Sequence, residues 1–273
     1  MGLFGKKEDP DDLMYDAMGM LDRNQPKAAI SLFNKVLKQE PRNTEALLQK
    51  GLALNLIKKY QDAITCFDKL IEIDPKDAQA LNNRGISMAE TGNIQGAAEY
   101  YDKAIEADSK YASAYFNKGV LLDKLQEHEE ALTVLEKAIT IDPKKPNAQI
   151  YKGIVLGKLK RNEEALNCFS SVCKKYPNNQ DALFQKGVQL AELGEHRKAL
   201  DVFDDILKKF KDNVNVTYAK SRSLAALERY PESLELLKQA VSKSPKVIRA
   251  WAKEEPIFTK LHSDEQFRRV VKL

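Results

Sequence analysis

Residues 78–108 read AQALNNRGISMAETGNIQGAAEYYDKAIEAD, and this stretch holds two amphipathic segments separated by a break. Leu81, Gly85 and Met88 follow one another at the i, i+4, i+7 spacing of one helix face. Thr91, Gly92 and Asn93 interrupt that pattern, and apolar spacing resumes at residue 94. The stretch therefore predicts a hairpin of two short helices that bury their facing sides.

The same pattern returns every 34 residues along the chain. A glycine column shows the period without an insertion: Gly51, Gly85, Gly119, Gly153 and Gly187, followed by Ser221. A second column is alanine and ends in serine: Ala29, Ala63, Ala97, Ala131, Ala165, Ala199 and Ser233. A third is aromatic or leucine: Phe33, Phe67, Tyr101, Leu135, Phe169, Phe203 and Leu237. The columns predict seven units, which begin at Pro10, Thr44, Ala78, Ala112, Pro146, Gln180 and Val214.

Residues at the unit boundaries and in the columns carry the local signals of this fold. Short polar side chains precede the expected first helices, where they can cap free backbone N–H groups: Asn43, Asp77, Asn179 and Asn213. The small residues of the glycine and alanine columns allow two helices to approach closely, and we expect the aromatic column to fill the space between them. From Ile248 onward the period breaks, and Ser263 with Gln266 predicts a capping box for a last helix.

Composition limits the classes of protein that remain. With 44 Lys+Arg against 40 Asp+Glu and 43% hydrophobic residues, the chain is nearly balanced in charge and apolar enough to fold. No apolar run is long enough for a membrane helix, and the first ten residues lack the apolar core of a signal peptide. Lys6 does not fit a myristoylation signal. We predict a cytoplasmic protein with no membrane partner.

The residues that carry catalysis or bind metals do not form a constellation in this sequence. We interpret His128, His196 and His262 as solvated histidines at turns and in the C-terminal segment. Cys66, Cys168 and Cys173 lack CxxC spacing and are interpreted as buried thiols. No glycine-rich phosphate loop follows a strand. The sequence therefore predicts no enzyme, no catalytic residue, no metal site and no cofactor.

The unit has Gly at position eight, Ala at twenty, an aromatic at twenty-four and Pro at thirty-two, and it resembles the tetratricopeptide repeat (TPR) family over residues 10–247. The resemblance implies an all-α fold, a right-handed superhelical solenoid of seven helical hairpins, which acts as a non-enzymatic scaffold or adaptor for protein binding. We divide the chain into a short charged N-terminal arm (1–9), seven repeats (10–247) and a helical C-terminal cap (248–273).

In that family, positions two, five, six, nine and twelve of each first helix face a concave groove. Transferred to this chain, positions five, six and nine give a candidate peptide-binding groove: Leu48, Gln49, Leu52, Asn82, Asn83, Ile86, Phe116, Asn117, Val120, Ile150, Tyr151, Ile154, Phe184, Gln185, Val188 and Tyr218, with Arg222 at the last position nine. The apolar members form a stripe, and the amides of position six suit a peptide backbone. The alternative is that the stripe packs against neighbouring first helices.

Position seven forms a basic column of candidate anion contacts: Lys50, Arg84, Lys118, Lys152, Lys186 and Lys220. The alternative is that their stems cover the glycine column while their charged ends reach water. The preferred partner is a protein or peptide, either extended or an amphipathic helix. Self-association into a homo-oligomer and nucleic-acid binding through the basic column remain as alternatives.

The TPR modules that hold acidic chaperone C-termini place Lys, Asn and Arg at set groove positions. The nearest window in this chain has no cation there; it consists of Asn82, Ile86, Asn117, Asn147 and Tyr151. We therefore predict that the chain does not bind chaperone C-terminal tails.

Overall fold

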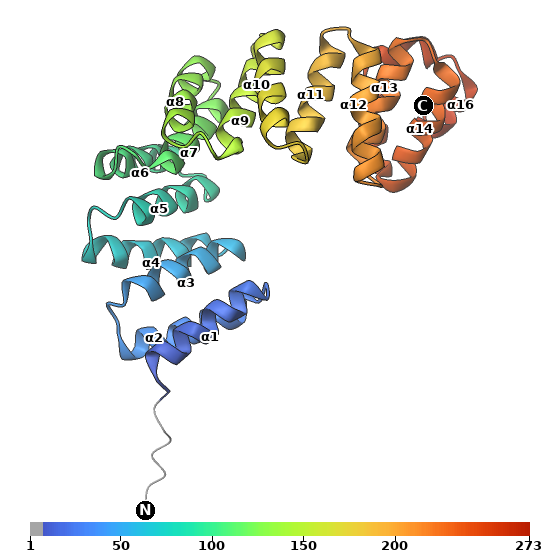
Figure 1. The fold of residues 1–273 in the computed structure, drawn as a ribbon. Helices are drawn as coiled ribbons and strands as arrows, with labels where there is room; N and C mark the ends of the chain where they lie inside the picture. Colours follow the sequence, from blue (N-terminus) through green and yellow to red (C-terminus); the bar gives the residue numbers. More distant parts are fainter. Residues whose placement is uncertain (1–7) are drawn as a thin grey trace, which may run out of the picture. The chain divides into compact units, whose positions relative to one another are not determined.

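The computed structural model describes residues 8–273 as helices joined by short turns, and this part of the chain contains no strand (Figure 1). The all-α class expected from the repeat is confirmed. The predicted N-terminal arm lies outside the described residues, apart from Glu8 and Asp9. The chain divides into two compact units, Met1–Lys144 and Lys145–Leu273.

The first unit is a stack of helical hairpins. Each odd-numbered helix packs on the even-numbered helix that follows it, and each even-numbered helix packs on the next odd-numbered one. The bounds are α1 (Pro10–Asp22), α2 (Pro26–Gln39), α3 (Thr44–Leu56), α4 (Tyr60–Ile73), α5 (Ala78–Glu90), α6 (Ile94–Ala107), α7 (Ala112–Lys124) and α8 (His128–Ile141). Because each contact joins neighbours in the sequence, this unit is a local stack of repeats.

The second unit continues the same alternation and ends in a cap. Its helices are α9 (Pro146–Lys158), α10 (Asn162–Lys175), α11 (Gln180–Glu192), α12 (His196–Lys209), α13 (Val214–Ala226), α14 (Tyr230–Lys243), α15 (Pro245–Glu254), the 3₁₀ helix η1 (Pro256–Leu261) and α16 (Glu265–Val271). Helices α15 and α16 both pack on α14, and η1 packs on α13.

The first helices begin at the residues that open the repeat units, from Pro10 to Val214. The four polar residues predicted as N-caps each accept a hydrogen bond from the backbone N–H three residues on, at 2.8–3.1 Å: Asn43, Asp77, Asn179 and Asn213. These bonds satisfy N–H groups that have no partner inside the helix. The predicted caps are thus confirmed, and they explain where these helices start.

The glycine and aromatic columns meet inside each hairpin, as predicted. A Cβ atom added at Gly51 would lie 2.5 Å from Cε1 of Phe67, and one at Gly153 would lie 2.7 Å from Cε1 of Phe169. Both phenylalanines are fully buried. The absent glycine side chain therefore leaves the space that the aromatic ring fills, which sets the distance between the two helices.

The C-terminal cap keeps more of the period than the sequence suggested. Phe267 and Val271 stand 34 residues after Ser233 and Leu237 and are fully buried on α16, as those columns are in the hairpins. The prediction of a capping box at Ser263 is wrong, because Asp264 caps α16 by accepting from the Phe267 N–H at 2.9 Å. The cap is therefore a shortened hairpin, in which η1 replaces the end of the first helix.

Candidate functional site

The first helices α3, α5 and α7 of the first unit carry the transferred groove positions. At position five, Leu48 and Asn82 are buried and Phe116 is half-buried. Asn82 accepts a hydrogen bond at 2.8 Å from Nδ2 of Asn117 on the next first helix. Position nine is half-buried in all three helices: Leu52, Ile86 and Val120. Position five is thus largely used for packing between first helices, and position nine remains accessible.

The amides at position six are already hydrogen-bonded within the unit. Gln49 donates to the Glu45 carboxylate at 2.7 Å, and Asn83 donates to the Gln79 carbonyl at 2.8 Å. Each partner lies one turn earlier in the same helix, so the amide folds back along its own surface. An amide has two N–H donors and a carbonyl acceptor, so one such bond leaves it able to bind a peptide backbone.

The second unit repeats this arrangement on α9 and α11. Ile150 at position five is buried, and Phe184, the equivalent residue of α11, is half-buried. The remaining predicted residues on these helices are all half-buried: Tyr151, Ile154, Gln185 and Val188. Each unit therefore has its own partly accessible apolar face formed by first helices.

The C-terminal cap covers the same positions of α13, so Tyr218 is not an open groove residue. Its ring lies 5.6 Å from Trp251 and 6.3 Å from Phe258, centroid to centroid. Arg222 Nε lies 2.6 Å from Oε2 of Glu255, at the junction between α15 and η1. The expectation that Tyr218 faces a partner is corrected, because the chain supplies its own aromatic and acidic groups at this end.

Sequence analysis began the groove at the second unit and so missed two residues of α1. Tyr15 and Met18 occupy positions six and nine of the first unit, and both are exposed, Tyr15 to 81%. Leu56, at position thirteen of α3, is 70% exposed. Transferring the positions to the first unit would have found Tyr15 and Met18.

Three members of the basic column are paired with carboxylates of the preceding hairpin. Arg84 pairs with Asp68, Lys118 with Asp102, and Lys220 with Asp204; in each pair the acid precedes the cation by 16 residues. The cations are therefore neutralised where hairpins meet, and they do not form a free basic column. The sequence signal was the acidic residue at position twenty-five, which was not considered. Asn34 and Ser170 occupy that position before Lys50 and Lys186.

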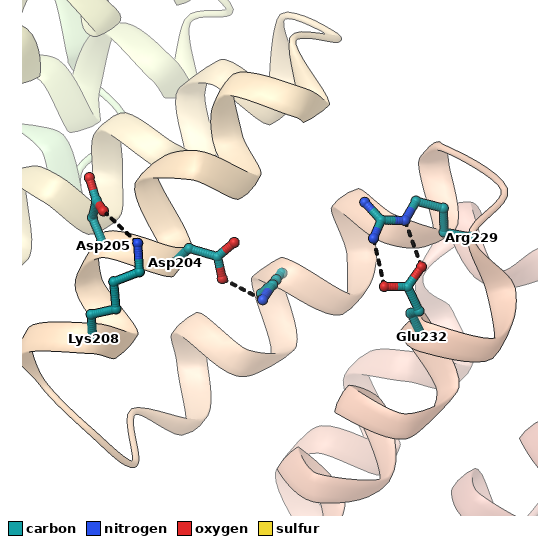
Figure 2. A network of polar contacts seen from close by, with 6 residues as sticks. Asp204, Asp205, Lys208, Arg229 and Glu232 are labelled. Carbon is teal, nitrogen blue, oxygen red and sulfur yellow. Dashed lines mark hydrogen bonds and ion pairs between the residues drawn. The ribbon is translucent and has the colours of Figure 1, made fainter.

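On the outer side of the second unit, a cleft of about 1070 Å³ lies between α12 and α14. Its walls include leucines, among them Leu200 and Leu224, and charges of both signs. Figure 2 shows part of this surface, where Arg229 donates to both carboxylate oxygens of Glu232 at 2.7 and 2.6 Å. Because cations and carboxylates alternate and pair here, the cleft does not favour a ligand of one charge.

The histidines are not solvated turn residues. His128 Nδ1 lies 3.0 Å from Oδ1 of the buried Asp123, and His196 is half-buried beside Arg222. Burial, and then the Arg222 charge, lower the pKa of His196. The prediction of solvation is wrong because position seventeen, the first residue of the second helix, packs under the turn.

The cysteines show no sign of activation. Burial raises the pKa of the Cys66 and Cys173 thiols, which leaves less of the reactive thiolate. Residues 8–273 contain no group of three or more side chains that could hold a metal ion. No helix in that range has the length and hydrophobicity needed to span a bilayer.

Stacked helical hairpins whose first helices share a half-buried apolar face define the class of helical-repeat proteins. The chain belongs to the tetratricopeptide repeat family. One family model with that description matches residues 57–112, 82–146, 152–214 and 189–248, and a second matches residues 20–82. A search of curated proteins finds no match.

Solved structures agree with this assignment. A tetratricopeptide repeat protein from Parabacteroides merdae is 15% identical, with 98% of each chain covered and a TM-score of 0.66. YrrB, described as a TPR protein with an unusual peptide-binding site, is 28% identical, with 68% of this chain and 97% of that chain covered and a TM-score of 0.56. MamA is 28% identical, with 61% and 94% covered and a TM-score of 0.52. The fold supports a protein-interaction scaffold in general, and such proteins are typically non-enzymatic.

Proposed function

We propose that the chain is a non-enzymatic adaptor that binds an extended peptide or an amphipathic helix on the first-helix face of its units. The observation that carries this proposal is the half-burial of position nine on α3, α5, α7, α9 and α11. These side chains remain partly accessible after the glycine, alanine and aromatic columns have formed the core. A row of partly accessible apolar groups on rigid helices is suited to apolar anchors of a partner.

The mechanism is preorganisation. The hairpins hold the anchors at fixed spacing before the partner arrives, so most of the ordering cost falls on the peptide. Amides at position six keep donors and acceptors for its backbone, as in Gln49 and Asn83. The peptide-binding site named for YrrB, to which the chain is similar, supports the same proposal.

A matched pair of substitutions in the second unit tests the proposal. Val188 on α11 and Val202 on α12 are both half-buried against one core cluster, but only Val188 lies at a groove position. Peptides would be selected from a random displayed library on the wild-type chain, and their affinity measured for both variants. We expect Val188→Asp to weaken binding at least about tenfold, equivalent to about 1.4 kcal/mol, and Val202→Asp to leave it within about twofold.

Equal loss in the two variants would show that the effect is destabilisation of the core. Unchanged binding to Val188→Asp would place the peptide site elsewhere and refute the proposal. Circular dichroism of both variants, compared at the temperature of the binding assay, provides the folding control.

Two further parts of the assignment remain proposals. We propose the division into repeats at 10–247 and a cap at 248–273, with the cap's first helix starting slightly earlier, at Pro245. We also propose a cytoplasmic location without a membrane partner. The pairing of Arg84, Lys118 and Lys220 with carboxylates favours packing over nucleic-acid binding for those cations.

A further inference from the structure

Exposed large apolar side chains are concentrated at the two ends of the chain. Of the seven found within residues 8–273, Leu56 and Leu125 are the two that lie in the body of the repeats. The other five are on the first helix and on the cap: Tyr15 and Met18 on α1, Val247 and Trp251 on α15, and Leu273 after α16. Exposed apolar groups on two opposite ends of a repeat stack indicate surfaces that a further hairpin would cover.

The positions of Tyr15 and Met18 explain what is missing. Within the units, position six contacts the preceding first helix, as in the bond from Asn117 to Asn82. Position nine does the same, since Arg222 Nη2 lies 3.6 Å from Oε1 of Glu192. Helix α1 has no preceding hairpin in its own chain, so its side chains at these positions remain exposed.

The charges of the two ends are opposite. Residues 8–22 contain six acids and no Lys or Arg: Glu8, Asp9, Asp11, Asp12, Asp16 and Asp22. The C-terminal segment from Pro245 contains seven cations and four acids: Lys246, Arg249, Lys253, Lys260, Arg268, Arg269 and Lys272, against Glu254, Glu255, Asp264 and Glu265. Within residues 8–273, neither Asp12 nor Asp16 forms an ion pair, and neither does the side chain of Arg268 or Lys272.

The ion-pair columns reverse their sign at these ends. The cation at position seven, such as Lys50, corresponds in the first unit to residue 50 − 34 = 16, which is Asp16. The acid at position twenty-five, such as Asp204, corresponds two units later to residue 204 + 68 = 272, which is Lys272. Helix α16 retains the register of a second helix, as the burial of Phe267 shows. A hairpin that followed Lys272 would therefore meet it with its own position seven, and Asp16 has the complementary charge.

We propose that copies of the chain join head to tail, with α1 of one copy docking on the α15–α16 cap of another, so that the contact between consecutive repeats continues across molecules. The acidic face of α1 meets the basic cap, and Tyr15 and Met18 are covered together with Val247 and Trp251. This contact is heterologous, because the two copies use different surfaces.

Charge reversal at each end tests the proposal on the full chain. One variant carries Asp12→Lys and Asp16→Lys, and the other carries Arg268→Glu and Lys272→Asp. Aspartate is used at 272 because Lys272 has a left-handed backbone, with φ of 58°, which aspartate tolerates. Sedimentation equilibrium over a range of concentrations would give the average mass, to be compared with the 30.9 kDa chain.

We expect the wild-type mass to exceed that of one chain and to rise with concentration at low salt. Each variant alone should remain at the single-chain mass, because its two ends then carry the same sign. An equimolar mixture of the variants should recover association, since the acidic α1 of the second variant meets the unmodified cap of the first. Association should weaken at about 1 M salt, where the Debye length is only about 3 Å.

A second pair of variants separates the apolar contact from general stickiness. Tyr15→Ser removes an exposed side chain of α1, whereas Leu56→Ser removes one of similar exposure on α3. We expect the first to weaken association at least about tenfold and the second to leave it unchanged. Trp251 is the only tryptophan, so its emission should shift to the blue as wild-type copies associate.

A wild-type chain that stays at 30.9 kDa at all concentrations would overturn the proposal. Association that survives in either charge-reversed variant, or that fails to return in the mixture, would also overturn it and indicate a different contact. Equal effects of Tyr15→Ser and Leu56→Ser would show that α1 is not the docking surface.

Discussion

Replacing Gly51 with alanine tests whether the glycine column sets the spacing of the helices. The new Cβ would lie 2.5 and 2.6 Å from two ring atoms of Phe67. Ordinary contacts between carbon atoms are about 3.5–4.0 Å, so the ring must move by about 1 Å. Phe67 is fully buried among Leu47, Ala63 and Leu70, which limits that movement. Overpacking of this kind costs about 1–3 kcal/mol.

The opposing contribution is helix propensity, which favours alanine over glycine by about 1 kcal/mol in a helix interior. Gly19→Ala is the matched control in the same unit, because a Cβ at Gly19 meets nothing within 4 Å. The propensity gain is common to the two variants, so the difference between them isolates the steric cost. We expect Gly19→Ala to match or exceed the wild-type stability, with Gly51→Ala about 1–3 kcal/mol below the control.

Thermal melting followed by circular dichroism measures this difference, because about 1 kcal/mol shifts the midpoint by about 2–4 °C in a chain of this size. Repeat stacks can unfold in steps, so hydrogen exchange of the α3 and α4 amides should accompany the melt. Equal midpoints and equal exchange for the two variants would refute the argument that Phe67 occupies the space left by Gly51.

Two other predictions concern the C-terminal end. Arg222→Ala should destabilise the second unit by about 1–3 kcal/mol, because it leaves Glu255 half-buried without its cation, whereas Arg229→Ala breaks the exposed pair with Glu232 and should cost at most about 0.5 kcal/mol. Urea unfolding distinguishes them, and equal costs would mean that Arg222 does not hold the cap. His196 has a lowered pKa, so the unfolded chain binds its proton first and stability should fall as pH drops below about 6.5. In melts between pH 5.5 and 7.5, His196→Gln should flatten this slope relative to wild type, and identical slopes would contradict the assignment.

The sequence by itself determined the repeat, the helix starts and the core of each hairpin. These depend on contacts between residues close in the chain, such as the N-cap bond of Asn43 or the packing of Phe67 on Gly51. A period of 34 residues reports such contacts directly, because each unit forms them in the same way.

The accessible part of the candidate site depended on tertiary structure. Position five looks the same as position nine in the sequence, yet Leu48 and Ile150 are buried, because first helices of consecutive hairpins approach most closely there. Tyr218 carries a groove residue's pattern but lies under Trp251 and Phe258 of the cap. The residues that cover these side chains belong to other hairpins or to the cap, and the pattern within one helix does not encode them. Burial between hairpins is a property of the assembled stack, so the open surface could be assigned only from the structure.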